Sequence, residues 1–243
     1  MRRACANFAC GFALVLALTL VGGAPAGADG PIVLPVPHIF AGFTVNPTPM
    51  PSRKEGRIPT SLRLTDTIWT DDDSRPPAME ELRFQLDSRL RLDLSGVPRC
   101  LWAPLQAYPA FDWDSCEKAE VATGPIRVEV ALAEQEPVKL SAPATAYNGR
   151  PGTMLIHAQF ADPVSGELVV PVKLSRADGG VYGVTLTASF PKVANGSGSL
   201  IYLGLRFRRG IFSVACTKRS FQSWVSHTFV GGTEASETFR SDC

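Results

Sequence analysis

The clearest pattern in the chain is the alternation of apolar and polar residues in "ELRFQLDSRLRLDL", residues 81–94. Leucine or phenylalanine stands at the even positions on both sides of Ser88, and most odd positions carry a charge. A period of two buries one face of a strand and leaves the other in water. The segment therefore predicts a strand pair or one long bent strand, with "DSR" as a tight turn. A helix is excluded, because Leu92 and Leu94 would point away from the face shared by the earlier leucines.

The same alternation recurs in five later segments. The apolar set lies at even positions in 126–132, 154–160, 168–174 and 182–190, and at odd positions in 201–207. Turn sequences such as "YNGRPG" and "NGSGS" separate these segments, and Asn148-Gly149 and Asn195-Gly196 are dipeptides that favour positive φ. About ten strands with frequent turns predict an all-β antiparallel sandwich of the immunoglobulin or jelly-roll kind. An open β-barrel is the alternative.

The N-terminal residues have the three parts of a secretory signal peptide. Arg2 and Arg3 precede an apolar run over 8–21, and "APAGA" supplies small residues for cleavage after Ala28. The run is shorter than the roughly 20 residues that span a bilayer, and no later stretch is a transmembrane candidate. Residues 1–28 are thus expected to be removed and the rest to be secreted. Residues 29–59 are rich in proline and are expected to form an extended arm, with a short edge strand near "IFAGFTV".

Residues 60–243 are expected to form one domain, and the charge balance limits its partners. The chain has 24 Lys+Arg and 23 Asp+Glu, and loss of Arg2 and Arg3 leaves 22 basic residues against 23 acidic ones. Nucleic-acid binding is therefore not expected, because it needs a basic face.

Four cysteines remain after residue 28: Cys100, Cys116, Cys216 and Cys243. An even number in an exported chain predicts disulfides, and four cysteines allow three pairings. Cys100–Cys116 and Cys216–Cys243 are favoured because each closes a local loop within one strand-and-turn unit. The second bridge would fix the last strand to its neighbour. Free thiols or zinc ligands are the alternative, but the sequence has no C-x-x-C pair.

The loop inside the first proposed bridge, "CLWAPLQAYPAFDWDSC", concentrates aromatic residues. Trp102, Tyr108, Phe111 and Trp113 lie within it, and rigid rings on a stapled loop suit a sugar- or protein-binding surface. The alternative is that these rings cap an open end of the core.

Several segments resemble a family of uncharacterised secreted proteins of high-GC bacteria. They are "RPPAMEELRFQLD", "SGVPRC", "SCEKAEVATGPIRVEV", "AYNGRPG", "SVAC" and "FRSDC", over roughly residues 60–243. Tyr147 replaces the family's phenylalanine at the N-G turn, and "GVP" replaces "GLP". The resemblance implies a secreted β-domain with two disulfides, and it implies no activity.

The chain offers weak candidates for catalysis or metal binding. "NGSGS" is not the strand–turn–helix context of a nucleophile elbow, so Ser197 and Ser199 are not expected to be nucleophiles. His157 and His227 are expected on strand surfaces. The paired carboxylates in "FDWDSC" and at Glu80-Glu81, the run "DDDS" and the arginines of "RFRRG" are most simply solvated surface groups.

We therefore expect no catalytic residues, no metal and no cofactor. The predicted function is that of a secreted, non-catalytic binding or structural module. Its ligand would be a cell-envelope polymer, a glycan or an extracellular protein. A secreted hydrolase whose site is not visible in the sequence is the alternative function, and a secreted inhibitor is a third.

Overall fold

The computed structural model describes residues 37–46, 56–101, 113–131, 136–161, 163, 165–176, 180–216 and 220–242. Within these ranges the secondary structure is almost entirely strand, with two short 3-10 helices, η2 (Trp113–Ala119) and η3 (Val193–Gly196). The strands are β1 (Pro37–Asn46), β2 (Ile58–Thr70), β3 (Met79–Asp87), β4 (Leu90–Leu92), β5 (Glu120–Val130), β6 (Val138–Asn148), β7 (Thr153–Phe160), β8 (Gly166–Arg176), β9 (Tyr182–Ser189), β10 (Gly198–Val214), β11 (Ser220–Phe229) and β12 (Glu234–Asp242). The edge strand expected near "IFAGFTV" is β1.

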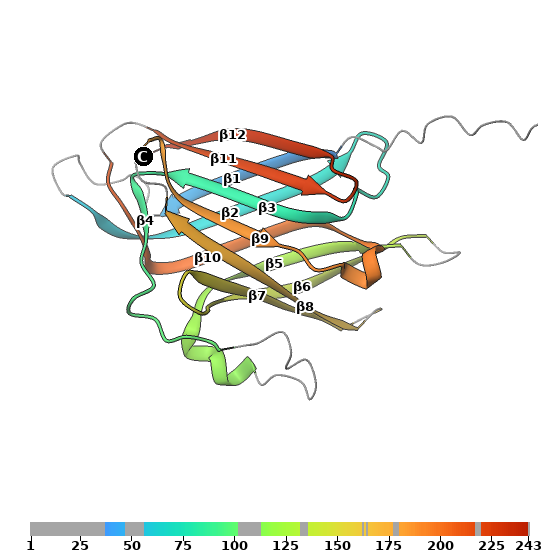
Figure 1. Cartoon of the computed structure of the whole chain (residues 1–243), viewed down its shortest axis with the longest axis horizontal. Helices are drawn as coiled ribbons and strands as arrows, with labels where there is room; N and C mark the ends of the chain where they lie inside the picture. Colours follow the sequence, from blue (N-terminus) through green and yellow to red (C-terminus); the bar gives the residue numbers. More distant parts are fainter. Residues whose placement is uncertain are drawn as a thin grey trace, which may run out of the picture. The chain divides into compact units, whose positions relative to one another are not determined.

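The strands of the described residues form one antiparallel sheet in the order β1-β2-β10-β5-β6-β7-β8-β9-β3-β11-β12, with β4 paired to β10 (Figure 1). The all-β prediction is confirmed. The sandwich is not confirmed, and the barrel alternative fits, because the sheet is nearly closed on itself. The reason lies in pairings between strands that are distant in sequence, such as β2–β10 and β9–β3. These pairings join all the strands into one hydrogen-bonded sheet, whereas a sandwich would divide them between two sheets.

Side chains close the seam between β1 and β12, the two ends of this strand order. No backbone ladder joins these strands within the described residues. Phe43 on β1 packs edge-on against Phe239 on β12, with ring centroids 5.5 Å apart, and also contacts Phe221 on β11 at 5.9 Å. The Ala41 amide donates to Glu237 Oε2 at 3.4 Å. Side-chain contacts, mainly apolar, therefore hold β1 and β12 together, whereas backbone hydrogen bonds join the other neighbouring strands.

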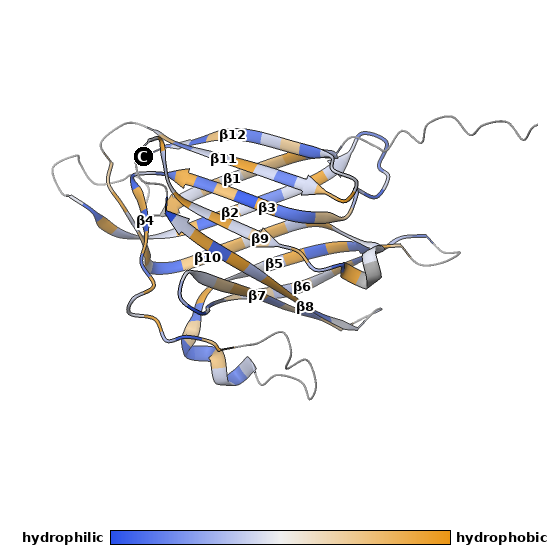
Figure 2. Cartoon of the chain, viewed as in Figure 1, coloured by the Kyte–Doolittle hydropathy of each residue, from blue (hydrophilic) through white to orange (hydrophobic). Residues whose placement is uncertain are grey.

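Hydrophobic and hydrophilic residues alternate along many of the strands (Figure 2), and this alternation separates buried from exposed side chains. In β3, Leu82, Phe84 and Leu86 are buried, as expected from the period of two. The prediction was wrong at the start of β10, where a β-bulge between Leu200 and Tyr202 shifts the register against β5. Leu200 is buried and Ile201 is only partly so, because a bulge inserts one residue and exchanges the two faces.

Side chains fill the interior of the barrel. The apolar cavity lined by core residues of β2, β3 and β7–β10 measures about 30 Å³, which is room for only one or two water molecules. The interior is thus a packed core and not a ligand chamber. A binding site has to lie on the outer face or at an end.

The "DSR" turn between β3 and β4 is held by a buried ion pair. Arg89 donates from Nε to Asp87 Oδ1 at 2.8 Å and from a terminal nitrogen to Asp87 Oδ2 at 2.6 Å. The Gln222 amide of β11 donates to the same Oδ2 at 2.9 Å. The turn was predicted, but β4 pairs with β10 and not with β3, so the two alternating halves are not a hairpin.

The "YNGRPG" turn differs from the expected one. Asn148 is still within β6, and Gly152 is the glycine that takes a positive φ, 74°. The Asn148 side chain is buried and donates from Nδ2 to Val97 O at 2.8 Å and Pro98 O at 3.1 Å. Asn148 therefore serves as an anchor for the segment that leads to Cys100.

Candidate functional site

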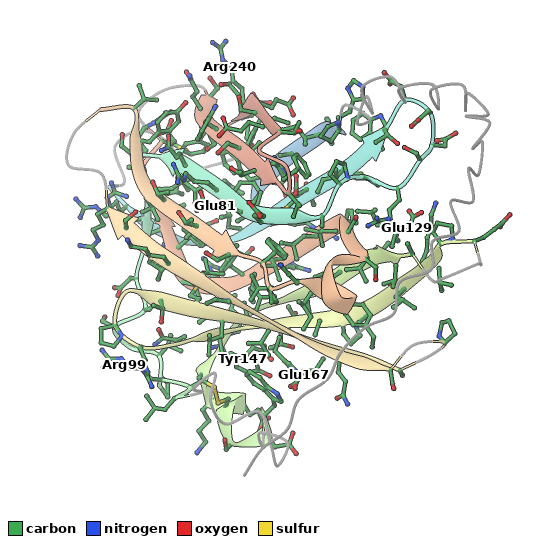
Figure 3. All side chains as sticks on the ribbon, turned by 45° about the vertical axis from the view of Figure 1, so that its right-hand side comes forward. Glu81, Arg99, Glu129, Tyr147, Glu167 and Arg240 are labelled. Atoms are coloured by element: carbon green, nitrogen blue, oxygen red, sulfur yellow. A yellow bond between two sulfur atoms is a disulfide. The ribbon has the colours of Figure 1, made fainter. Side chains whose placement is uncertain are left out.

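The Cys100–Cys116 disulfide is present, with Cα atoms 5.0 Å apart. The Cys100 amide donates to Asn148 O at 2.8 Å, which ties the bridge to the end of β6. Both cysteines belong to a small buried cluster with Ala119, Tyr147 and Leu155, separate from the main core. Figure 3 shows the disulfide on the same side of the sheet as Tyr147 and Glu167. The disulfide and η2 thus cover the outer face of β6–β8.

Trp113 faces the barrel. Its ring stacks on His157 with centroids 4.0 Å apart and on Tyr147 at 5.4 Å. Its Nε1 donates to Glu167 Oε1 at 2.5 Å. For Trp113 these contacts favour a cap, although over an outer face of the sheet and not over an open end. The other three aromatic candidates, Trp102, Tyr108 and Phe111, lie outside the described residues, so their role stays a prediction.

His157 lies on the outer face of β7, as predicted, but Trp113 covers it. Its Nε2 is 2.9 Å from Glu167 Oε1, and its side chain is only 11% exposed. Burial lowers the pKa of His157 below its ordinary value, and the nearby Glu167 carboxylate opposes this shift only in part. His157 is therefore neutral at pH 7 and sealed beneath an aromatic ring, a poor arrangement for a base that must reach a substrate.

The prediction that His227 is a surface residue was wrong. His227 is fully buried, and its Nε2 lies 3.0 and 2.9 Å from the two carboxylate oxygens of buried Asp66. The sequence of β11 could have predicted the burial of His227, because His227 has the same parity as Phe221, Val225 and Phe229. The pair lies inside the core, where no substrate has access.

The second proposed disulfide is partly visible. Cys216 is disulfide-bonded, and its expected partner, Cys243, lies outside the described residues. Strand β12 ends at Asp242, whose register partner Ser220 on β11 lies four positions after Cys216. The Cys216–Cys243 pairing stays a prediction.

Several of the other polar candidates have structural partners. Asp71 pairs with His38 at 2.9 Å, and Asp72 Oδ1 accepts from the Ser74 amide at 3.1 Å, so "DDDS" is a turn after β2. Ser199 is buried, donates to Pro76 O and accepts from Arg75 at 2.8 Å. Glu81 accepts from Arg83 at 2.7 Å. No group of three or more potential metal ligands occurs among the residues with described positions.

An exposed aromatic surface, which the sequence analysis missed, lies on the outer face of β1 and β2. Phe40 is 60% exposed and Trp69 is 42% exposed. His38 pairs in register with Trp69, and Phe40 with Thr67, so the two aromatic residues are diagonal neighbours within reach of each other. The His38 ring stacks on Trp69 with centroids 5.7 Å apart. We call His38, Phe40 and Trp69 the aromatic face.

The row that contains Phe40 continues across the sheet. Thr67 pairs with Tyr202 on β10, and Tyr202 with Arg127 on β5. The Arg127 guanidinium lies 5.3 Å from the centre of the Tyr202 ring. Neighbouring strands are about 4.8 Å apart, which puts the Phe40 and Tyr202 backbones about 10 Å apart. Rings and planar groups therefore extend from the aromatic face over four strands.

Comparison with family models, curated proteins and solved structures gives no match for this chain. The resemblance to secreted two-disulfide proteins thus stays a prediction. Among the described residues, no helix combines the length and apolar character needed to cross a membrane.

Proposed function

We propose that this protein is an exported, non-catalytic binding module that recognises a glycan through the aromatic face. The observation that carries the proposal is the exposure of Phe40 and Trp69 side by side on adjacent strands. Large aromatic rings in water are costly unless a partner covers them, and they bury a large area at low entropic cost when one does. Flat rings supported by a sheet suit the apolar faces of sugar rings.

Polar groups at the edge of the aromatic face support a sugar ligand over a purely apolar one. His38 and Asp71 form an exposed pair beside Trp69, with the Asp71 side chain 85% exposed. Such groups exchange hydrogen bonds with hydroxyl groups. Apolar stacking with a few placed polar groups is the usual composition of a specific small-molecule site.

Binding is favoured over hydrolysis because of where the histidine–carboxylate pairs lie. His227–Asp66 is inside the core, and His157–Glu167 lies beneath Trp113. His38–Asp71 is accessible but belongs to an open surface. General acid–base catalysis needs a group within hydrogen-bond reach of a bound substrate, and a concave site holds a substrate in that position better than an open surface does.

Co-sedimentation of residues 29–243 with insoluble cell-wall material and a panel of polysaccharides tests the proposal. The Phe40→Ala, Trp69→Ala variant should lose binding and keep the melting temperature, because both side chains are exposed. The matched control is Val181→Ala, Val230→Ala, which removes two exposed apolar side chains outside both the aromatic face and the stapled loop (52% and 46% exposed). The Trp102→Ala, Trp113→Ala variant tests the stapled loop. Loss of binding in that variant alone would assign recognition to the loop and refute the aromatic face.

A further inference from the structure

An arginine-lined pocket lies at the end of the barrel where β4 begins. It measures about 580 Å³ and is lined by Arg57, Arg91 and Arg176, with Asp93, Ser88 and Ser213 among the other residues. These residues come from the start of β2, from β4 and the turn before it, and from the ends of β8 and β10. A second pocket of about 290 Å³ adjoins it, since both contact Arg176, Leu92 and Val184. The second pocket adds Arg99, which Figure 3 labels.

The positive charge in the pocket is only partly compensated, with three arginines against one aspartate in the lining. None of Arg57, Arg91 and Arg176 forms an ion pair with a carboxylate of the described residues; Arg57 donates to Arg89 O at 2.8 Å. Asp93 is the acidic residue of the lining; its Oδ1 accepts from the Ser95 amide at 2.9 Å, and its pKa is lowered by the Ser95 hydrogen bonds and by the charge of Arg176, so it offsets part of that charge. Desolvation and the like charge of Arg91 lower the pKa of Arg57, so the two guanidinium groups are close enough to repel. An anion between them would relieve that repulsion.

Close packing and backbone hydrogen bonds hold the segment that carries Arg91 in place. The Ser88 turn packs directly on β9, where a Cβ at Gly183 would lie 2.8 Å from Ser88 Cα. The Ser88 amide donates to Val181 O at 2.8 Å, and the Asp93 amide donates to Ile211 O at 2.9 Å. These contacts fix β4 with Arg91 facing the same pocket as Arg57 and Arg176. The chain is otherwise nearly neutral, with 24 basic and 23 acidic residues, so this convergence is a local feature.

We propose that this pocket binds the phosphate group of a small phosphorylated molecule. Guanidinium groups match phosphate oxygens in geometry and charge, and paired donors give bidentate contacts. The Ser88 and Ser213 hydroxyls add donors, and Leu92 and Val184 supply apolar wall for the organic part. A volume near 580 Å³ is in the range of small-molecule sites. The site is separate from the aromatic face and does not depend on glycan binding.

Isothermal titration at low ionic strength tests the proposal with glucose 6-phosphate, inorganic phosphate and glucose as probes. We expect saturable binding of both anions, tighter binding of the sugar phosphate, no binding of glucose, and weaker binding as salt is raised. The Arg91→Gln, Arg176→Gln variant should bind at least about tenfold more weakly. Arg63→Gln, Arg206→Gln is the matched control, because it removes two facing arginines from the outer surface of β2 and β10. This control should bind as the wild type does.

Amide chemical shifts of the wild type provide a test that needs no variant. Added inorganic phosphate should move the signals of Ser88, Asp93, Gly183 and Ser213. The pocket would be overturned as a specific site if binding did not saturate or if the shifted signals mapped elsewhere. Equal losses of affinity in the two double variants would overturn it as well. Equal affinity for inorganic phosphate and glucose 6-phosphate would overturn the assignment of an organic ligand in favour of the free ion.

Discussion

His227 Nε2 lies 2.9 Å from Asp66 Oδ2, and this contact joins β11 to β2 across the inside of the barrel. Each of these strands is one position in from the seam between β1 and β12. The pair is fully enclosed, and the other ring nitrogen, Nδ1, has no hydrogen-bond partner among the described residues. A buried hydrogen bond therefore supports the seam from inside the barrel, in addition to the phenylalanine contacts.

Breaking this hydrogen bond should be costly. Asp66→Ala leaves the imidazole buried without its partner, and we expect the free energy of unfolding to fall by about 3–5 kcal/mol. The double variant Asp66→Leu, His227→Phe should recover most of this loss, because an apolar pair leaves no buried polar group without a partner. Urea denaturation of the three proteins measures both effects. A single variant as stable as the wild type would show that the pair does not hold the seam.

Asp87 should contribute an acid-sensitive part of the stability. Burial alone would raise its pKa, but hydrogen bonds from Arg89 and from the Gln222 and Arg89 amides outweigh burial and lower it. A carboxyl whose pKa is lowered by folding stabilises the protein above about pH 4 and loses this contribution as the pH falls through the folded pKa. Asp87→Asn should destabilise the protein at pH 7 by about 1–3 kcal/mol and flatten the acid limb of its stability curve. Asp242→Asn, an exposed change on β12, is the control and should leave that limb intact.

Trp113 should control the titration of His157. Its ring excludes water from the imidazole, so Trp113→Ala should raise the pKa of His157 toward its ordinary value near 6.5. In the wild type the lowered pKa favours folding above about pH 6.5, and this contribution falls as the pH decreases below that value. NMR titration of the His157 ring measures the shift. Val230→Ala, far from the cap in sequence, should not change it, and an unchanged pKa in Trp113→Ala would contradict the cap.

Cys243→Ser should release the last strand. Loss of a Cys216–Cys243 bridge should cost roughly 3 kcal/mol on the loop-entropy model and speed proteolysis within β12. Peptide mapping under non-reducing conditions identifies the pairing directly. An unchanged melting temperature and unchanged protease resistance in Cys243→Ser would show that no such bridge holds the last strand.

The strands and their buried faces could be predicted, because a period of two is a local property. Leu82, Phe84 and Leu86 followed it without exception, whereas Ile201 did not, since a bulge depends on the partner strand. Barrel closure could not be predicted in the same way. It requires β2 to pair with β10 and β3 with β9, and alternation says which face of a strand is buried but not which neighbour it has.

In the candidate site, too, local strand patterns could be predicted and contacts between distant segments could not. The alternation of β2 placed Leu62, Leu64 and Ile68 inward, so Trp69 had to point outward, and this information was in the sequence. The proximity of Phe40 to Trp69 depended on the register of β1 against β2. The arginine pocket depended on five segments that meet at one end of the barrel, which no local pattern encodes.

If the aromatic face binds a glycan, the ring at position 69 stacks on a sugar, and one binding comparison tests this most directly. Binding of the wild type, Trp69→Tyr and Trp69→Leu to the same insoluble polysaccharide should be measured as full isotherms. We expect Trp69→Tyr to keep most of the affinity and Trp69→Leu to lose it, because leucine keeps apolar area but has no flat ring. Equal affinity of all three proteins, or no binding by any of them across the panel, would contradict recognition of a glycan by the aromatic face.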